Sequence, residues 1–169
     1  MRAELEIELA EQFPFMRKKE SLQEQMENGG ISDLYSAYGC EMGDGWYELI
    51  SDLCTEITAA YVRAGVPVDI VIDQVKEKWG PLRFYYHTAD HPVGIHAFDI
   101  VGVGCLRNTG GDSLLEREIA EIVSKYEGKS VTVCEECGKP GALRTTGDVR
   151  TLCDECFENR SSRYPQVYL

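Results

Sequence analysis

The sequence predicts an α+β protein: two amphipathic helices packed on a small antiparallel sheet or hairpin, followed by a four-cysteine finger. Apolar residues recur at helical spacing in two segments, 44–65 and 113–128, and predict the helices. An aromatic-rich segment at 68–86 predicts the hairpin. We therefore expect an acidic body over residues 1–128 and a finger with its tail over residues 129–169.

The N-terminal segment fits two kinds of secondary structure. Residues 3–12 alternate apolar and acidic side chains, which suits either a strand or an acidic helix. Pro14 and Phe15 interrupt this pattern. The polar stretch from residue 17 to 32, with a Gly-Gly breaker at 29–30, predicts a helical turn and a loop.

The first long helix is predicted to begin at Asp44, as its N-cap, and to end at Gly65. Cys54 lies on its apolar face and is therefore predicted to be a small core side chain, not a reactive thiol. The apolar face consists of Trp46, Leu49, Ile50, Leu53, Cys54, Ile57 and Tyr61.

Residues 68–86 fit either a helical face or two strands joined by Gly80-Pro81. We favour the hairpin, with strands at 74–79 and 82–86, because the second run is rich in aromatic strand formers and adjoins the turn.

The second long helix is predicted from a capping box formed by Ser113 and Glu116, and Gly128 is expected to end it. Residues 130–133 then lead directly into the first cysteine pair. With no flexible linker between them, body and finger are expected to form one cooperative unit.

The finger carries the most specific chemical signal in the chain. Its cysteines follow the pattern C-x2-C-x15-C-x2-C, which lies within the ~15–20-residue spacing of paired zinc knuckles. Gly138 permits the first knuckle to turn, residues 142–144 and 149–152 predict a short hairpin, and residues 154–160 predict a helical turn. We expect a zinc ribbon or treble-clef-like finger that binds one structural Zn²⁺, closed to substrate by four thiolates. The predicted ligands are Cys134, Cys137, Cys153 and Cys156.

The charge of the chain limits the choice of partner. The formal net charge is −12, and from Lys129 onward six basic residues balance six acidic ones, so residues 1–128 carry the entire excess. Because an acidic body repels phosphate backbones, duplex binding through a broad basic face is disfavoured and a protein with a basic surface is the expected partner.

No apolar run reaches the ~18 residues of a membrane span, and no segment reads as a signal peptide. We expect a cytoplasmic protein.

Four blocks of sequence resemble, in the same order, those of a family of small uncharacterised bacterial and phage or prophage proteins. The blocks are GDGWYELI at 43–50 with Leu53-Cys54, QVKEKWGPLRFYY at 74–86, CEECG at 134–138 and TLCDEC at 151–156. The chain differs at Gly80-Pro81, where Gly-Gly is usual, and in a longer segment at 87–112. The finger alone, over 134–160, resembles the DksA/TraR zinc-finger type, whose members bind RNA polymerase, although the coiled-coil arm of that type has no counterpart here.

The inserted segment 87–112 carries the main candidate for catalysis. His87, His91 and His96 lie within ten residues beside Asp90, a composition that could form a metal site with an open coordination position. However, no H-E-x-x-H pattern places two ligands on one helical face, so solvated loop histidines are the preferred interpretation.

We interpret the chain as a non-enzymatic, zinc-stabilised interaction protein, with no catalytic residue assigned. It would be a phage or mobile-element accessory or anti-defence factor whose acidic surface binds a basic host protein in the host cytoplasm. One alternative is a small metal-dependent hydrolase that uses the histidine segment. Another is binding of nucleic acid or RNA polymerase through the finger, using Lys139, Arg144, Arg150, Arg160, Arg163 and Tyr164.

Overall fold

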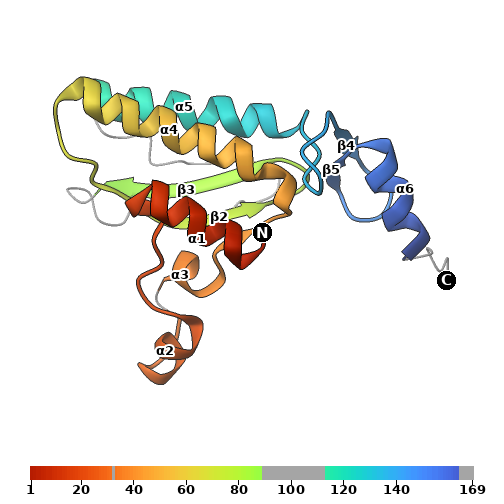
Figure 1. The fold of residues 1–169 in the computed structure, drawn as a ribbon, viewed down its shortest axis with the longest axis horizontal. Coiled ribbons are helices and arrows are strands. Elements are labelled where there is room, and N and C mark those ends of the chain that lie inside the picture. The colour runs from red at the N-terminus through yellow and green to blue at the C-terminus, as the bar shows by residue number, and fades with distance from the viewer. Residues whose placement is uncertain (32, 89–112, 164–169) are drawn as a thin grey trace, which may run out of the picture.

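The computed structural model describes residues 1–31, 33–88 and 113–163, with side chains described as far as residue 160. Figure 1 shows a body of helices over a small sheet, with the finger at one end. The helices are α1 (Ala3–Gln12), η1 (Pro14–Met16), α2 (Leu22–Glu27), α3 (Leu34–Tyr38), η2 (Asp44–Trp46), α4 (Tyr47–Ala64), α5 (Leu114–Ser130) and α6 (Asp154–Arg163). The strands are β1 (Cys40–Glu41), β2 (Ile70–Glu77), β3 (Leu82–Thr88), β4 (Ala142–Arg144) and β5 (Arg150–Leu152).

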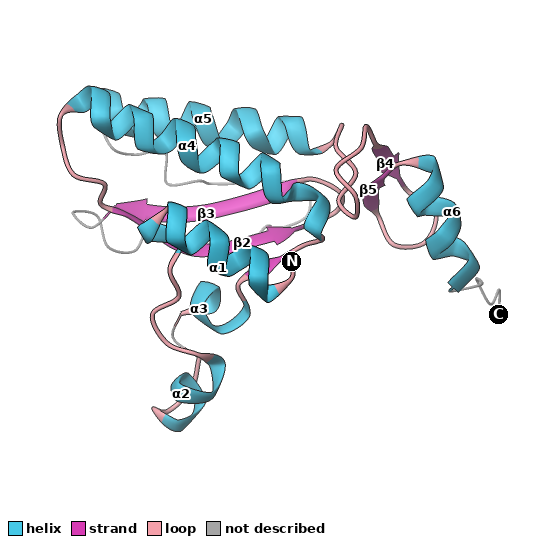
Figure 2. Cartoon of the chain, in the orientation of Figure 1, coloured by secondary structure: helices cyan, strands magenta, loops and turns pink. Residues whose placement is uncertain are grey.

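The body has two layers, which confirms the predicted α+β class. β2 pairs antiparallel with β3, and the short β1 adds in parallel to the other edge of β2. The two long helices, α4 and α5, lie side by side over this sheet (Figure 1). The finger contributes a separate two-stranded sheet, β4–β5, beside α6 (Figure 2).

The core of the body lies between these two layers. Trp46, Leu53 and Ile57 are completely buried, as are Val75 and Leu82 of the hairpin. Full burial of an aliphatic side chain stabilises a protein by about 1.5–3 kcal/mol. The finger has its own small buried cluster of Cys134, Leu152 and Cys153. The large core and the small one therefore do not share buried residues.

The hairpin prediction for residues 68–86 is confirmed. β2 starts at Ile70, four residues earlier than expected, and a bulge between Ile72 and Gln74 shifts its register. Pro81 is compatible with the hairpin because it lies between the strands, where the amide that proline lacks is not needed for the ladder.

Two predicted helix boundaries are wrong. Asp44 does not cap α4: it lies in the short η2 turn, and its carboxylate accepts hydrogen bonds from Arg2 N (2.7 Å) and Arg2 Nε (2.5 Å). Gly128 does not end α5, which continues to Ser130. Ser130 Oγ donates to the Glu127 carbonyl oxygen (2.6 Å) and accepts from Leu82 N (2.9 Å), so the last turn is held by the sheet.

Other signals at the helix ends are confirmed. Gly65 ends α4 in the left-handed conformation, with φ +70°. The Ser113–Glu116 capping box is present, and Cys54 is completely buried. Residues 3–12, which fitted a strand or a helix, form the helix α1.

Of the segments the structure describes, none forms a helix that is both long and apolar enough to cross a membrane. His91, His96 and Asp90 fall outside the described residues.

Candidate metal centre

The four predicted cysteine ligands come together at one point of the finger. Their sulfur atoms all lie within 4.8 Å of one another, and Cys137 Sγ is 3.7 Å from Cys153 Sγ. All four are free thiols. Ligand sulfurs about 2.3 Å from a tetrahedral zinc lie about 3.8 Å from each other. The cluster can therefore hold a metal ion.

Local turns bring the two pairs together. In the first knuckle, Gly138 adopts φ +76° and its N–H donates to the Cys134 carbonyl oxygen (2.9 Å). The β4–β5 hairpin then returns the chain to Cys153, and Cys156 lies on the first turn of α6. The Cys156 N–H points at Cys153 Sγ (3.4 Å) and lowers the pKa of that thiol to about 7. A lowered pKa makes this thiol easier to deprotonate, and a cysteine must lose its proton to bind a metal ion.

The GDGW block holds the first knuckle against the body. Gly43 N donates to the Glu135 carboxylate (3.0 Å), and Gly45 N donates to the Glu135 carbonyl oxygen (2.8 Å). The indole of Trp46 donates to the Val133 carbonyl oxygen (2.8 Å). A Cβ built at Gly45 would collide with knuckle backbone, including Cys137 N at 2.5 Å. Glycine at position 45 thus permits contact that no other residue allows.

The turn between β2 and β3 holds the other side of the finger. Gly80 adopts φ +104° and pairs with Arg150 of β5. Thr151 Oγ1 donates to the Gly80 carbonyl oxygen (2.9 Å), and both groups are buried. The side chain of Leu143 occupies the space that a Cβ on Gly80 would need. Both body motifs of the family resemblance, around Gly45 and Gly80, therefore contact the finger.

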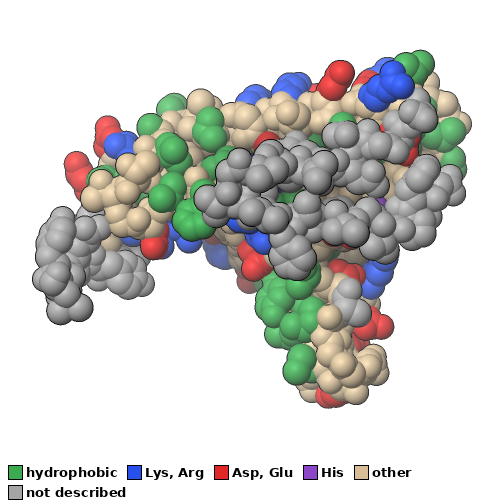
Figure 3. All heavy atoms as spheres, turned by 180° about the vertical axis from the view of Figure 1, so that it is seen from behind, with side chains coloured by type: hydrophobic (Ala, Val, Ile, Leu, Met, Phe, Trp, Pro, Cys, Tyr) green, Lys and Arg blue, Asp and Glu red, His purple; other side chains and the backbone are tan. Residues whose placement is uncertain are grey.

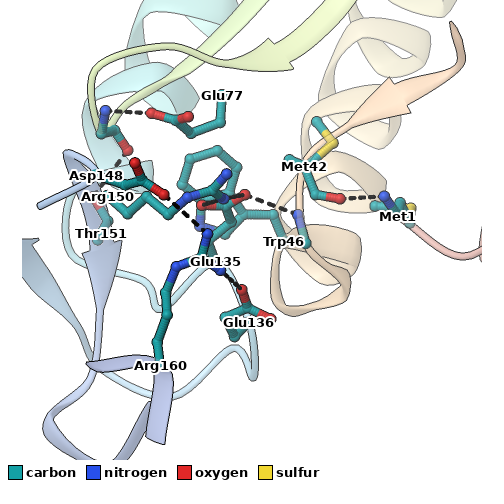
Figure 4. A network of polar contacts seen from close by, with 12 residues as sticks. Met1, Met42, Trp46, Glu77, Glu135, Glu136, Asp148, Arg150, Thr151 and Arg160 are labelled. Atoms are coloured by element: carbon teal, nitrogen blue, oxygen red, sulfur yellow. Dashed lines mark hydrogen bonds and ion pairs between the residues drawn. The ribbon is translucent and has the colours of Figure 1, made fainter. Parts of the chain in front are cut away.

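A buried ion pair lies at the centre of this junction. Glu135 is completely buried, and both of its carboxylate oxygens accept from Arg150 Nη1, at 2.7 and 2.8 Å (Figure 4). Burial raises the pKa of the Glu135 carboxyl, although Arg150 and the Gly43 amide oppose the rise. Sequence reasoning missed this residue because Glu135 and Glu136 are chemically identical neighbours, and only the fold distinguishes the buried one.

Replacing Glu135 with alanine is expected to reduce the free energy of unfolding by at most about 3–5 kcal/mol, because the partly buried Arg150 would lose its counter-charge. Glu136→Ala is the matched control. Glu136 makes a more exposed ion pair with Arg160 (3.3 Å), so its loss should cost under about 1 kcal/mol. Urea denaturation of both variants measures the difference. Equal losses would show that the Glu135–Arg150 pair does not stabilise the junction.

Of the three histidines of the segment 87–112, only His87 lies within the described residues. His87 lies on β3, and its Nδ1 is 2.9 Å from Asp73 Oδ1 of β2. The four-cysteine cluster is the only group of three or more potential metal ligands within the described residues.

The basic side chains proposed for nucleic-acid binding are paired within the protein. Arg144 contacts Asp154 (2.5 Å) and stacks on Phe157, Lys139 contacts Glu155 (2.9 Å), and Arg150 contacts Glu135. Arg160 contacts Glu136 and Asp148. The side chains of Arg163 and Tyr164 lie outside the described residues. Every described cation of the set thus has an acidic neighbour.

Cys40, the other cysteine of the described body besides Cys54, is a buried core residue. Cys40 is 2% exposed, and burial raises the pKa of its thiol to about 12. A thiol in this state is a poor nucleophile at neutral pH.

A scan against protein-family models and searches of curated proteins and solved structures returned no match for this chain.

Proposed function

We propose that the protein is a non-enzymatic interaction module whose rigid acidic body binds a basic surface on another protein, and whose finger binds one structural Zn²⁺. The observation that carries the zinc assignment is the meeting of four free sulfurs within 4.8 Å. Four thiolates fill a tetrahedral coordination sphere, so the ion would stabilise the fold and leave no position for water. The proposed ligands are Cys134, Cys137, Cys153 and Cys156.

The location of the finger supports a structural role. Its knuckle and its hairpin contact the GDGW turn and the Gly80 turn. Four of its cations form ion pairs with neighbouring carboxylates: Lys139, Arg144, Arg150 and Arg160. We propose that residues 129–169 act as a cap on the body of residues 1–128. Under this proposal, the surface that recognises a partner belongs to the body.

One acidic face of the body supports the choice of a basic partner. Glu8 of α1 and Glu48 of α4 both lie near Tyr47, whose hydroxyl accepts from Gln12 of α1 (3.2 Å). The helices therefore meet here, and their exposed carboxylates share one region. We call this region the α1–α4 acidic face and define it by Glu8 and Glu48.

Negative charge on a rigid surface gives fast, salt-sensitive association with a basic cleft. A nuclease or defence complex that normally holds nucleic acid presents such a cleft. The resemblance to phage and prophage proteins is consistent with a mobile-element factor that acts in the cytoplasm of a host. We propose anti-defence activity of this kind.

The test is affinity capture of bacterial host proteins on the immobilised full-length chain. A specific partner should be retained at low salt, released at high salt, and lost when Glu8→Gln and Glu48→Gln are combined. The matched control combines Asp148→Asn with Glu155→Gln, which removes two charges from exposed finger pairs. A partner retained equally by both variants at high salt would contradict the proposal, because the acidic face would not be its binding surface.

A further inference from the structure

A small arm projects from the body and has an unusual distribution of polar and apolar side chains. We define the arm as residues 20–31 and 33–38, which include α2 and α3; in Figure 1, α2 lies at its far end, away from the sheet. The chain enters the arm through a neck, Arg17 to Lys19, that follows η1.

The arm is folded around a polar side chain. Gln25 is 1% exposed, and its side-chain amide accepts from Asp33 N (2.8 Å) and donates to the carbonyl oxygens of Asp33 (3.0 Å) and Glu20 (3.3 Å). Capping at both helices adds further order, from Ser21 with Glu24 and from Asp33. The arm is thus a built structure, and its outer surface has a defined shape.

The apolar side chains of the arm lie on its outside. Met26 is 60% exposed, and four others are 39–45% exposed. Leu22 and Met26 are four positions apart on α2, and Leu34 and Tyr38 are four positions apart on α3, so each pair lies on one face of its helix. The fifth residue, Ile31, lies between the two helices in the sequence. In the view from behind, hydrophobic side chains gather along one side of the projection (Figure 3). We call this set the apolar stripe; it consists of Leu22, Met26, Ile31, Leu34 and Tyr38.

This pattern indicates a surface that another molecule covers. Single exposed apolar residues are ordinary, but a contiguous patch on a projecting element marks an interaction site. An arm that buries the polar Gln25 and exposes five large apolar side chains gains little stability from hydrophobic burial. The stripe is stabilising only if a second surface removes it from water.

The charges of the arm indicate which surface that is. The far end is acidic, with Glu24 and Glu27 of α2 both exposed. The neck is basic: Arg17 and Lys19 are exposed, and neither forms an ion pair with any residue in the described part of the chain. Two arms laid antiparallel would bring each acidic end beside the other's basic neck.

We propose that the arm is a homodimerisation element: two copies pack their apolar stripes against each other, antiparallel, across a two-fold axis. A two-fold contact buries the same patch on both copies and closes the assembly at a dimer. Because the arms project, the contact lies between the arms and not between the two acidic bodies. The dimer is independent of the proposed binding function and rests on different residues.

The test is the molar mass of the full-length protein by light scattering and sedimentation velocity, at concentrations up to about 0.3 mM. If the Kd of the dimer is about 10 µM, most of the protein would be dimeric at that concentration. Met26→Asp combined with Leu34→Asp should weaken association at least tenfold while leaving the circular dichroism spectrum unchanged, because both side chains are exposed. Val62→Asp is the matched control, since Val62 is 72% exposed on α4. It should leave the dimer intact.

A charge exchange tests the antiparallel arrangement. Arg17→Glu with Lys19→Glu, and Gln23→Lys with Glu27→Lys on α2, should each weaken the homodimer by like-charge contact. Mixed one to one, the two double variants should form a heterodimer, because every end then faces an opposite charge. A monomeric wild-type protein, a dimer unaffected by Met26→Asp with Leu34→Asp, or no heterodimer in the mixture would overturn the proposal.

Discussion

Removing the proposed zinc ion with a chelator is expected to unfold residues 134–156 and to leave the α4–α5 core of the body folded. The buried cluster of the finger consists of Leu152 and two of the cysteines, Cys134 and Cys153, so little apolar burial remains there without the metal. Structural zinc sites supply about 10–16 kcal/mol of apparent binding free energy, which for such modules is folding free energy. The body keeps its own, much larger core, which includes Leu53, Ile57 and Val75. We therefore expect the two parts to unfold separately, and not as the one cooperative unit that the short connection suggested.

Two measurements can locate this effect within the chain. In hydrogen exchange, the amides of Gly45, Glu135 and Gly138 should lose protection, because their acceptors lie in or against the finger. In fluorescence, a Trp79→Tyr variant leaves Trp46 as the sole tryptophan, and its emission should shift to the red as the contact with Val133 is lost.

The control for zinc removal is restoration of the metal. One equivalent of zinc per chain should return both signals, and Cys137→Ser should prevent the return, because Cys137 is one of the four sulfurs of the cluster. If the amides of Gly45 and Glu135 remain protected in metal-free protein, the finger is held by its contacts with the body, and the metal has no structural role.

The metal cluster could be predicted from the sequence because its signal is local. Two knuckles of fixed spacing need only a turn at Gly138 and a short hairpin to meet, and each is specified by neighbouring residues. The hairpin at 70–88 was predictable for a similar reason, since its strand formers adjoin its turn.

The junction between body and finger could not be predicted because its contacts are distant in the sequence. Gly43 meets Glu135 across 92 positions, and Gly80 meets Thr151 across 71. No periodicity within one segment reports such a contact. The capping expectation for Asp44 failed in the same way: Arg2, 42 positions away, binds the carboxylate that was expected to cap the helix. The helical turn and loop expected at 17–32 are present as α2 and the turn that follows it, but the burial of Gln25 could not be predicted, because it depends on a hydrogen bond from Asp33.

Replacing Gly45 with alanine is expected to detach the finger, with a loss of at least about 2–3 kcal/mol in the free energy of unfolding. The new methyl group would meet the backbone of Cys134, Cys137 and Gly138, and Cys137 N would be only 2.5 Å away. Backbone held in a metal knuckle cannot rotate aside as a flexible side chain can. The chain must therefore separate the knuckle from the turn and give up the Gly45–Glu135 hydrogen bond. Denaturant unfolding measures the loss, and hydrogen exchange should show it first at Glu135.

Gly128→Ala is the matched control, with an expected change of opposite sign. Gly128 lies inside α5, and a Cβ there would meet nothing within 4 Å. Alanine within a helix is more stable than glycine by about 0.5–1 kcal/mol, since the unfolded chain has less backbone freedom to lose. The same substitution should thus destabilise the protein at position 45 and stabilise it at position 128. A Gly45→Ala protein as stable as wild type would mean that the knuckle can move away from the turn, and that the zinc site and the body are coupled only through the chain that joins them.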